Sequence, residues 1–201
     1  MDGTDRRRGA MFKASRPALI FGSLLVVAAE LFATGASAQS ARRGGERADL
    51  LGGLLAAGTS GEICYARSYA ADHLAAHPHQ RVTAMTLLLK RGREPATPAE
   101  FQIFVTVRGD RNLWSANGEC AAGSGITCSV ECDGGGFSIA SNATPQTVLL
   151  SLEDPDGRIS MNGCDGGERE LQAGRDDRRF RLDRAPNSVC AAAARRMERG
   201  R

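Results

Sequence analysis

From residue 82 onward, the chain consists of short apolar runs in which every second residue is hydrophobic, and turns rich in glycine and aspartate separate these runs. In one run, Phe101, Ile103 and Val105 alternate with other side chains. Because successive side chains of a β-strand point to opposite faces of its sheet, a period of two predicts strands that bury one face. Eight such runs are present: 82–90, 101–107, 113–120, 126–132, 137–140, 147–152, 158–162 and 179–183.

No helical pattern lies between these runs, so parallel crossover connections, which need a long segment, are not expected. The sequence predicts an all-β fold, mainly an antiparallel meander of about eight short strands that forms a small barrel or a sandwich. The segment Asp154-Pro155-Asp156-Gly157 predicts a hairpin, since proline presets one turn residue and glycine accepts a positive φ.

One short helix is expected at the N-terminal end of this domain. The segment from Tyr65 to Ala76 is rich in alanine, contains neither proline nor glycine, and is followed by Pro78, which cannot continue a helix. The first half of the segment, Cys64–Tyr69, fits a strand equally well, and both alternatives stay open.

The first 38 residues have the three parts of a secretory signal. Five basic residues lie between positions 6 and 16, an apolar run spans 18–29, and Ala36 and Ala38 place small side chains where a signal peptidase reads them. We expect cleavage after Ala38. The alternative is an uncleaved anchor, but a membrane-spanning helix needs about 20 apolar residues and this run is shorter. The chain is therefore expected to meet the membrane only during export and to function in the periplasm or as a secreted protein.

The signal and the strand pattern divide the chain into four parts. Residues 1–38 are the predicted signal peptide, 39–61 a flexible leader rich in arginine, glycine and alanine, 62–190 a single β domain, and 191–201 an Arg-rich tail.

The cysteines predict that disulfides stabilise the domain. All six follow the predicted cleavage site: Cys64, Cys120, Cys128, Cys132, Cys164 and Cys190. An even number of cysteines in an exported chain predicts a disulfide framework. Cys120 and Cys128 flank a short loop and can face each other across two strands, and Cys64 and Cys190 bracket the domain, which leaves Cys132 for Cys164. Strand parity in the run 126–132 places the side chains of Cys128 and Cys132 on the inward, apolar face.

The charge of the mature chain is close to balanced. The whole chain has 26 Lys and Arg residues against 23 Asp and Glu, and removing the five basic and three acidic residues of the signal leaves 21 against 20. Nucleic-acid grooves need clustered excess positive charge and stacking aromatic residues, so no nucleic-acid partner is expected.

The three histidines of the chain, His73, His77 and His79, fall within seven residues. On a helix, His73 and His77 share a face because they are four residues apart. Imidazole nitrogens suit Zn²⁺ and Cu²⁺, so this cluster is a candidate metal site with one of these ions as its cofactor. The alternative is an exposed helix end without a bound metal.

No residue set predicts a catalytic mechanism, and no residue is singled out as catalytic. The leading hypothesis is an exported, non-catalytic β domain that binds a protein or a component of the cell envelope. The alternatives are a periplasmic metal-binding protein that uses the histidine cluster, an inhibitor of a cell-wall hydrolase, and an enzyme whose pocket brings distant carboxylates or the histidines together.

Overall fold

The computed structural model describes residues 50–93, 99–123, 125–141, 145–152, 157–163 and 167–200. The predicted signal peptide, residues 1–38, and the beginning of the predicted leader lie outside the described residues. The strands and helices are β1 (Glu62–Ser68), α2 (Ala71–Ala76), β2 (Val82–Arg91), β3 (Ala99–Val107), β4 (Leu113–Ala122), β5 (Ile126–Val130), β6 (Gly136–Ser141), β7 (Thr147–Ser151), β8 (Arg158–Gly163), β9 (Glu168–Gln172), β10 (Arg179–Ala185) and α3 (Asn187–Arg199). Residues 50–56 are also helical.

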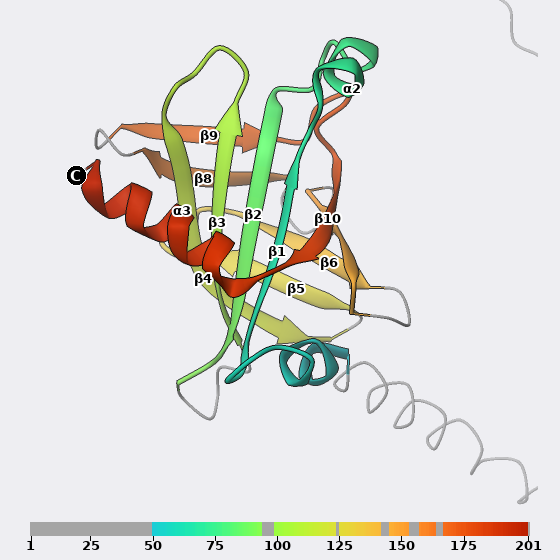
Figure 1. Ribbon diagram of the computed structural model, residues 1–201, viewed down its shortest axis with the longest axis vertical. Helices are drawn as coiled ribbons and strands as arrows, with labels where there is room; N and C mark the ends of the chain where they lie inside the picture. The colour runs from blue at the N-terminus through green and yellow to red at the C-terminus, as the bar shows by residue number, and fades with distance from the viewer. Residues whose placement is uncertain are drawn as a thin grey trace, which may run out of the picture. The chain divides into compact units, whose positions relative to one another are not determined.

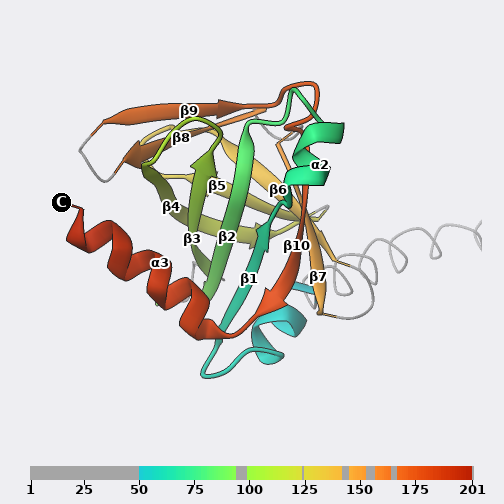
Figure 2. The same cartoon turned by 45° about the horizontal axis from the view of Figure 1, so that its top comes forward.

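Eight of the strands form a closed antiparallel barrel (Figures 1 and 2). Strands β1 to β7 are neighbours in the order of the chain, and β10 closes the ring because it pairs with β7 on one side and with β1 on the other. Strands β8 and β9 form a hairpin outside this ring, where β8 pairs with two residues of β4. The predicted all-β class is therefore confirmed, and of the two predicted architectures the chain adopts the barrel.

Side chains fill the interior of the barrel, as an eight-stranded ring is narrow enough to allow. The inward-facing residues include Tyr65, Phe101, Phe137 and Phe180, each at most 1 % exposed. The rings of Phe101 and Phe137 meet edge to face with their centroids 4.9 Å apart.

All eight predicted runs are strands, and the structure adds two further strands, β1 and β9. β9 was missed because its sequence is mostly charged and only Leu171 enters the core. β1 takes up the first half of the segment predicted as a helix, and the helix α2 covers only the second half. The strand alternative is confirmed there because β1 pairs with β2 along its whole length and buries Ile63 and Tyr65 in the barrel.

The predicted hairpin at Asp154-Pro155-Asp156-Gly157 does not join paired strands. Residues 153–156 lie outside the described residues, but β7 before them pairs with β6 and β10, whereas β8 after them pairs with β4 and β9. A turn motif reverses the chain locally but does not choose the strand partner. Here the partner is chosen by packing, since β8 buries Ile159 and Met161 together with Leu171 of β9.

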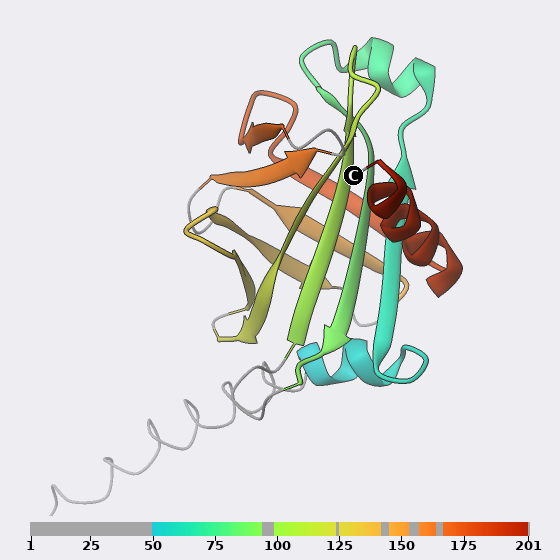
Figure 3. The same ribbon diagram turned by 90° about the vertical axis from the view of Figure 1, so that its left-hand side faces the viewer.

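The domain extends beyond both predicted boundaries. In the segment assigned to a flexible leader, Leu51, Leu54 and Leu55 are each 2 % exposed and belong to the main core. The segment assigned to a tail continues α3, which runs along the outside of the barrel (Figure 3) and buries Met197 against Phe104. These segments were misassigned because their apolar residues are few and acquire a partner only when the barrel has formed.

Within the described residues, no helix combines the length and the apolar character needed to cross a membrane.

We call the junction between β10 and β1, the last and the first strand of the ring, the seam. Among the described residues, it has fewer residue pairs than any other junction between neighbouring strands of the ring. β1 and β10 share three residue pairs, from Cys64↔Ala185 to Ala66↔Asp183, whereas β1 and β2 share seven. Two further links reinforce the seam. Cys64 of β1 forms a disulfide with Cys190 of α3, and the hydroxyl of Tyr65 donates a hydrogen bond to the carbonyl of Pro145 at 3.0 Å.

Candidate functional site

A cleft of about 510 Å³ opens on the outer surface where the seam ends. β10 pairs with β7 from Arg179 to Asp183, but it pairs with β1 only from Asp183 onward. The beginning of β10 therefore has β7 as its only neighbour in the sheet, and the cleft lies beside it. Its lining residues are Arg67, Tyr69, His73, His77, Gln80, Leu149, Arg175, Asp176, Arg178, Arg179 and Arg181. We call it the arginine cleft.

Strand parity directs two of these arginines outward. Phe180 and Leu182 of β10 are buried in the barrel, so Arg179 and Arg181, which alternate with them, lie on the outer face and are exposed. Arg67 comes from the end of β1, past the last residue that pairs with β10. The cleft therefore collects cations from both sides of the seam.

The remaining arginines come from the loop 173–178, and Asp177 anchors this loop to the barrel. Its side chain is 2 % exposed and accepts hydrogen bonds from the main-chain N–H groups of Arg81, at 2.7 Å, and Val82, at 3.3 Å. Burial raises the pKa of Asp177 above its ordinary value, although the two N–H groups oppose this effect. Arg175 and Arg178 thus extend from a loop that is fixed at its buried side.

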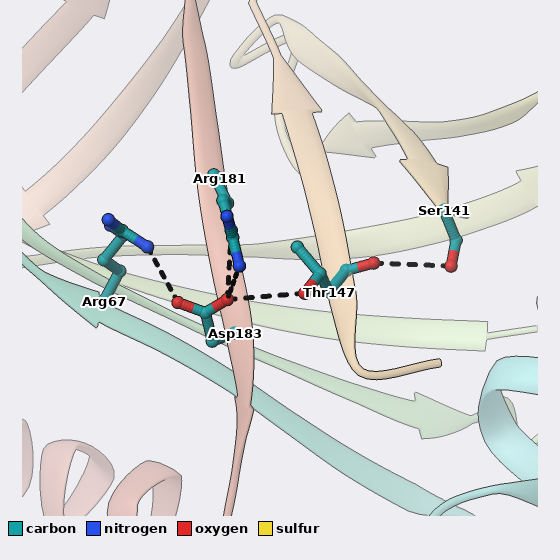
Figure 4. A network of polar contacts seen from close by, with 5 residues as sticks. All are labelled: Arg67, Ser141, Thr147, Arg181 and Asp183. Atoms are coloured by element: carbon teal, nitrogen blue, oxygen red, sulfur yellow. Dashed lines mark hydrogen bonds and ion pairs between the residues drawn. The ribbon is translucent and has the colours of Figure 1, made fainter. Parts of the chain in front are cut away.

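Asp183 links the arginines on the two sides of the seam (Figure 4). Its carboxylate lies 2.8 Å from Nη1 of Arg67 and 3.0 Å from Nη2 of Arg181, and Thr147 donates its hydroxyl to it at 3.3 Å. Partial burial acts to raise the pKa of Asp183, but the hydrogen bonds and charges of Arg181 and Arg67 outweigh it, so the pKa lies below its ordinary value. The carboxylate is therefore ionised at neutral pH and orients both guanidinium groups.

Three rings form one wall of the cleft. The ring of Tyr69 stacks on that of His73 with centroids 5.0 Å apart, and His73 stacks on His77 at 4.3 Å. The histidine pair follows from the four-residue spacing on α2, as predicted. Burial raises the pKa of Tyr69 to about 12, although the nearby charge of Arg67 opposes this. The hydroxyl of Tyr69 therefore keeps its proton at neutral pH.

The three predicted metal ligands do not share one environment. Nε2 of His73 lies 3.0 Å from the side-chain oxygen of Gln80, and Nδ1 of His77 lies 2.9 Å from the carbonyl of His73. Nε2 of His79 contacts Nη1 of Arg175 at 3.1 Å. Across the described part of the chain, no three His, Cys, Asp or Glu side chains are grouped to hold a metal ion. Metal binding by this cluster stays a prediction, which calorimetric titration with Zn²⁺ and Cu²⁺ tests.

Two of the three predicted disulfides are present. Cys64 is bonded to Cys190, and Cys120 to Cys128, which face each other on β4 and β5. The third predicted disulfide, between Cys132 and Cys164, is not present, because Cys132 is a free cysteine; Cys164 itself lies outside the described residues.

The inward orientation predicted for Cys132 is wrong, because β5 ends at Val130. Cys132 and Asp133 follow in a turn with φ of 56° and 57°, and the cysteine side chain is exposed. This turn lies against β8, since the carbonyl of Gly134 accepts a hydrogen bond from the N–H of Ser160 at 2.8 Å.

The sequence did not reveal the arginine cleft. Four of its five arginines lie within residues 175–181 and the fifth, Arg67, lies far away in the chain, and the near-neutral total charge of the mature chain conceals them. The available signal was local: arginine alternates with buried residues in Arg179-Phe180-Arg181-Leu182, directly after the arginines of the loop 173–178. This pattern predicts a cationic outer strand face, but not the neighbours of that strand.

Chemically, the cleft offers fixed positive charge and many N–H donors. An arginine side chain is always protonated in proteins and carries five N–H donors. The arrangement therefore suits the binding of an anionic group more than the transfer of protons. Comparison with models of known protein families, with curated proteins and with solved structures finds no match to this chain.

Proposed function

We propose that this chain is exported to the periplasm or secreted, and that it acts there as a non-catalytic domain that binds a protein or envelope component through the arginine cleft. One observation carries the proposal: five arginine side chains from three segments line a single outer cleft of about 510 Å³. Such a concentration of one charge attracts and orients a ligand of the opposite charge.

The disulfides support the exported location. Bonds between Cys64 and Cys190 and between Cys120 and Cys128 persist in oxidising compartments, whereas thiols are kept reduced in the cytosol. The apolar run and the small residues that end at Ala38 provide the signal for reaching such a compartment.

The protonation states of the arginines and of Tyr69 support binding without catalysis. A general acid or base works best when its pKa lies near the operating pH. The arginines do not lose their protons, and the pKa of Tyr69, at about 12, is far above neutrality. The charged side chains that dominate the lining therefore hold a ligand but do not exchange protons with it.

Capture from an envelope extract tests the proposal. The purified disulfide-bonded protein is immobilised and compared with a double variant, Arg178→Glu with Arg181→Glu, which reverses two charges in the cleft. The matched control is Arg199→Glu, an exposed position at the end of α3 that does not line the cleft.

We expect an envelope component that the wild-type protein and the control retain and the double variant loses. Exposed ion pairs contribute little to stability, so loss of the Arg181–Asp183 contact should leave the double variant folded, which its circular dichroism spectrum checks. Equal retention by all three proteins, or none by the wild type, would contradict the proposal.

A further inference from the structure

We infer that the ligand of the arginine cleft is a phosphorylated molecule with more than one phosphate group, and this inference rests on the function proposed above. The charged lining is almost entirely cationic, since among the described residues Asp176 is the one carboxylate beside five arginines. Asp176 accepts a hydrogen bond from the main-chain N–H of His79 at 3.0 Å, so one of its oxygens already has a partner in the protein. The cleft therefore favours a ligand with several negative charges.

The guanidinium groups are held in position by the protein itself. Asp183 holds Arg67 and Arg181, Nε of Arg178 donates to the carbonyl of Gly174 at 2.9 Å, and Arg175 lies against the ring of His79. Each guanidinium has five N–H donors, so these contacts leave donors for a ligand. Because the donors are already oriented, less conformational freedom is lost on binding.

The directions from which the arginines come favour phosphate over carboxylate. Arg67 belongs to β1, Arg175 and Arg178 to the loop 173–178, and Arg181 to β10. A phosphate group presents three strong acceptor oxygens around one centre, whereas a carboxylate presents two oxygens in one plane. Cations from the two sides of the seam can therefore bind different oxygens of the same phosphate. The number of arginines and the volume of the cleft leave room for a second phosphate.

Tyr69 adds an uncharged donor to this set. It lines the cleft beside Arg67, whose Cζ lies 5.7 Å from the centre of the tyrosine ring. Because its hydroxyl stays protonated at neutral pH, Tyr69 donates a hydrogen bond and does not repel an anionic oxygen. The cleft thus combines charged and neutral donors on one side of the seam.

Calorimetric titration of the purified disulfide-bonded protein with tripolyphosphate tests the inference. Citrate, which carries several negative charges on carboxylates, is the comparator at the same pH and ionic strength. We expect tripolyphosphate to bind at one site at least about tenfold more tightly than citrate. Arg175→Ala and Arg178→Ala should each weaken this binding by about tenfold, as expected for loss of a charged hydrogen bond. The matched control, Arg199→Ala on α3, should leave it unchanged.

Vesicles distinguish the two sources of phosphate. Co-sedimentation with vesicles that contain cardiolipin, whose headgroup carries two phosphate groups, but not with phosphatidylcholine vesicles, reversed by tripolyphosphate, would identify a lipid headgroup. Binding of tripolyphosphate without co-sedimentation would identify a soluble phosphorylated ligand, and both results support the inference. Citrate binding as tight as tripolyphosphate, or equal weakening by Arg199→Ala, would overturn it. If an envelope component retained through the cleft is released by citrate and tripolyphosphate alike, the phosphate inference fails while the proposed function stands.

Discussion

Asp183 shows how one side chain can serve both the barrel and the cleft. It belongs to the last residue pair of the seam, Ala66↔Asp183, and its carboxylate binds guanidinium groups from the two sides of that seam (Figure 4). Its pKa lies below the ordinary value of 3.8. A carboxyl whose pKa is lowered by folding stabilises the folded state while it is ionised, and this contribution is lost as the pH falls through the pKa of the folded state.

We therefore expect Asp183→Asn to change how stability depends on pH. Near pH 7 the variant should be less stable than the wild type, and the difference should shrink as the pH falls below the ordinary pKa of 3.8 toward the lower pKa of the folded protein. Urea unfolding midpoints at pH 7 and pH 3 measure this. A difference between the two proteins that stays constant over this pH range would show that the ionised carboxylate has no such role.

At the same scale, Tyr65, the residue that follows Cys64 in β1, provides a side-chain hydrogen bond at the seam. Tyr65→Phe removes the hydrogen bond to the carbonyl of Pro145 and should lower the free energy of unfolding by about 0.5–1.5 kcal/mol. Tyr69→Phe is the matched control, because the Tyr69 hydroxyl has no hydrogen bond to any of the described residues. Urea unfolding of both variants at pH 7 measures the two changes, and an equal loss in the control would contradict the assignment.

Among the elements, β4 depends on a glycine at its centre. Gly118 pairs with Phe101 of β3 and with Val130 of β5, and a Cβ at this position would overlap the carbonyl oxygen of Ser129 and press on the ring of Phe101. β4 also pairs with three strands, β3, β5 and β8. A residue without a side chain lets these strands approach.

We expect Gly118→Ala to lower the free energy of unfolding by about 3 kcal/mol, because the neighbouring backbone must shift to admit the methyl group. Gly52→Ala is the matched control. Gly52 is exposed in the helical segment 50–56, and a Cβ there meets nothing within 4 Å, so the change should stabilise the protein by up to about 1 kcal/mol. Denaturant unfolding of both variants measures the contrast. Similar losses in both would show that the close approach at Gly118 is tolerated.

Element by element, the sequence predicted strands better than their partners. All eight predicted runs are strands because alternation reports burial of one face, which each strand encodes in its own residues. The hairpin expected at Asp154-Pro155-Asp156-Gly157 was wrong because pairing depends on residues far away in the chain, such as Leu171, which packs with β8. The arginine cleft was missed for the same reason, since only the pairing of β1 with β10 brings Arg67 to the four arginines of residues 175–181.

For the whole molecule, closure of the ring depends on the seam. The disulfide Cys64–Cys190 joins residues 126 positions apart, whereas Cys120–Cys128 spans 8 positions. A disulfide restricts the unfolded chain more when it closes a longer loop. The same bond ties α3 to β1, so it holds the last element of the fold against the first strand.

Replacing both cysteines of a pair by alanine should therefore have unequal effects. Chain entropy predicts a loss of about 5 kcal/mol for Cys64→Ala with Cys190→Ala, and about 2.5 kcal/mol for Cys120→Ala with Cys128→Ala. Guanidinium unfolding of the two double variants compares them directly. A larger loss from the β4–β5 bond would contradict the view that the seam governs closure.

Export provides the last prediction at this scale. The chain isolated from the periplasm or the culture medium should begin at Gln39, because Ala36 and Ala38 present small side chains to the signal peptidase. Intact-mass measurement with N-terminal sequencing checks this. A chain that retains residues 1–38 in the membrane fraction would contradict export with cleavage.

The sequence by itself determined the all-β class, the eight predicted strand runs and two disulfide pairs. These features depend on alternation along single strands and on cysteines that either flank one loop or bracket the domain. Only the tertiary structure decided that the sheet closes through β10, that β8 and β9 leave the ring, and that arginines of β1, the loop 173–178 and β10 meet in one cleft. The physical reason is that burial of one face is encoded residue by residue, whereas the neighbours of a strand depend on how all the buried faces pack together.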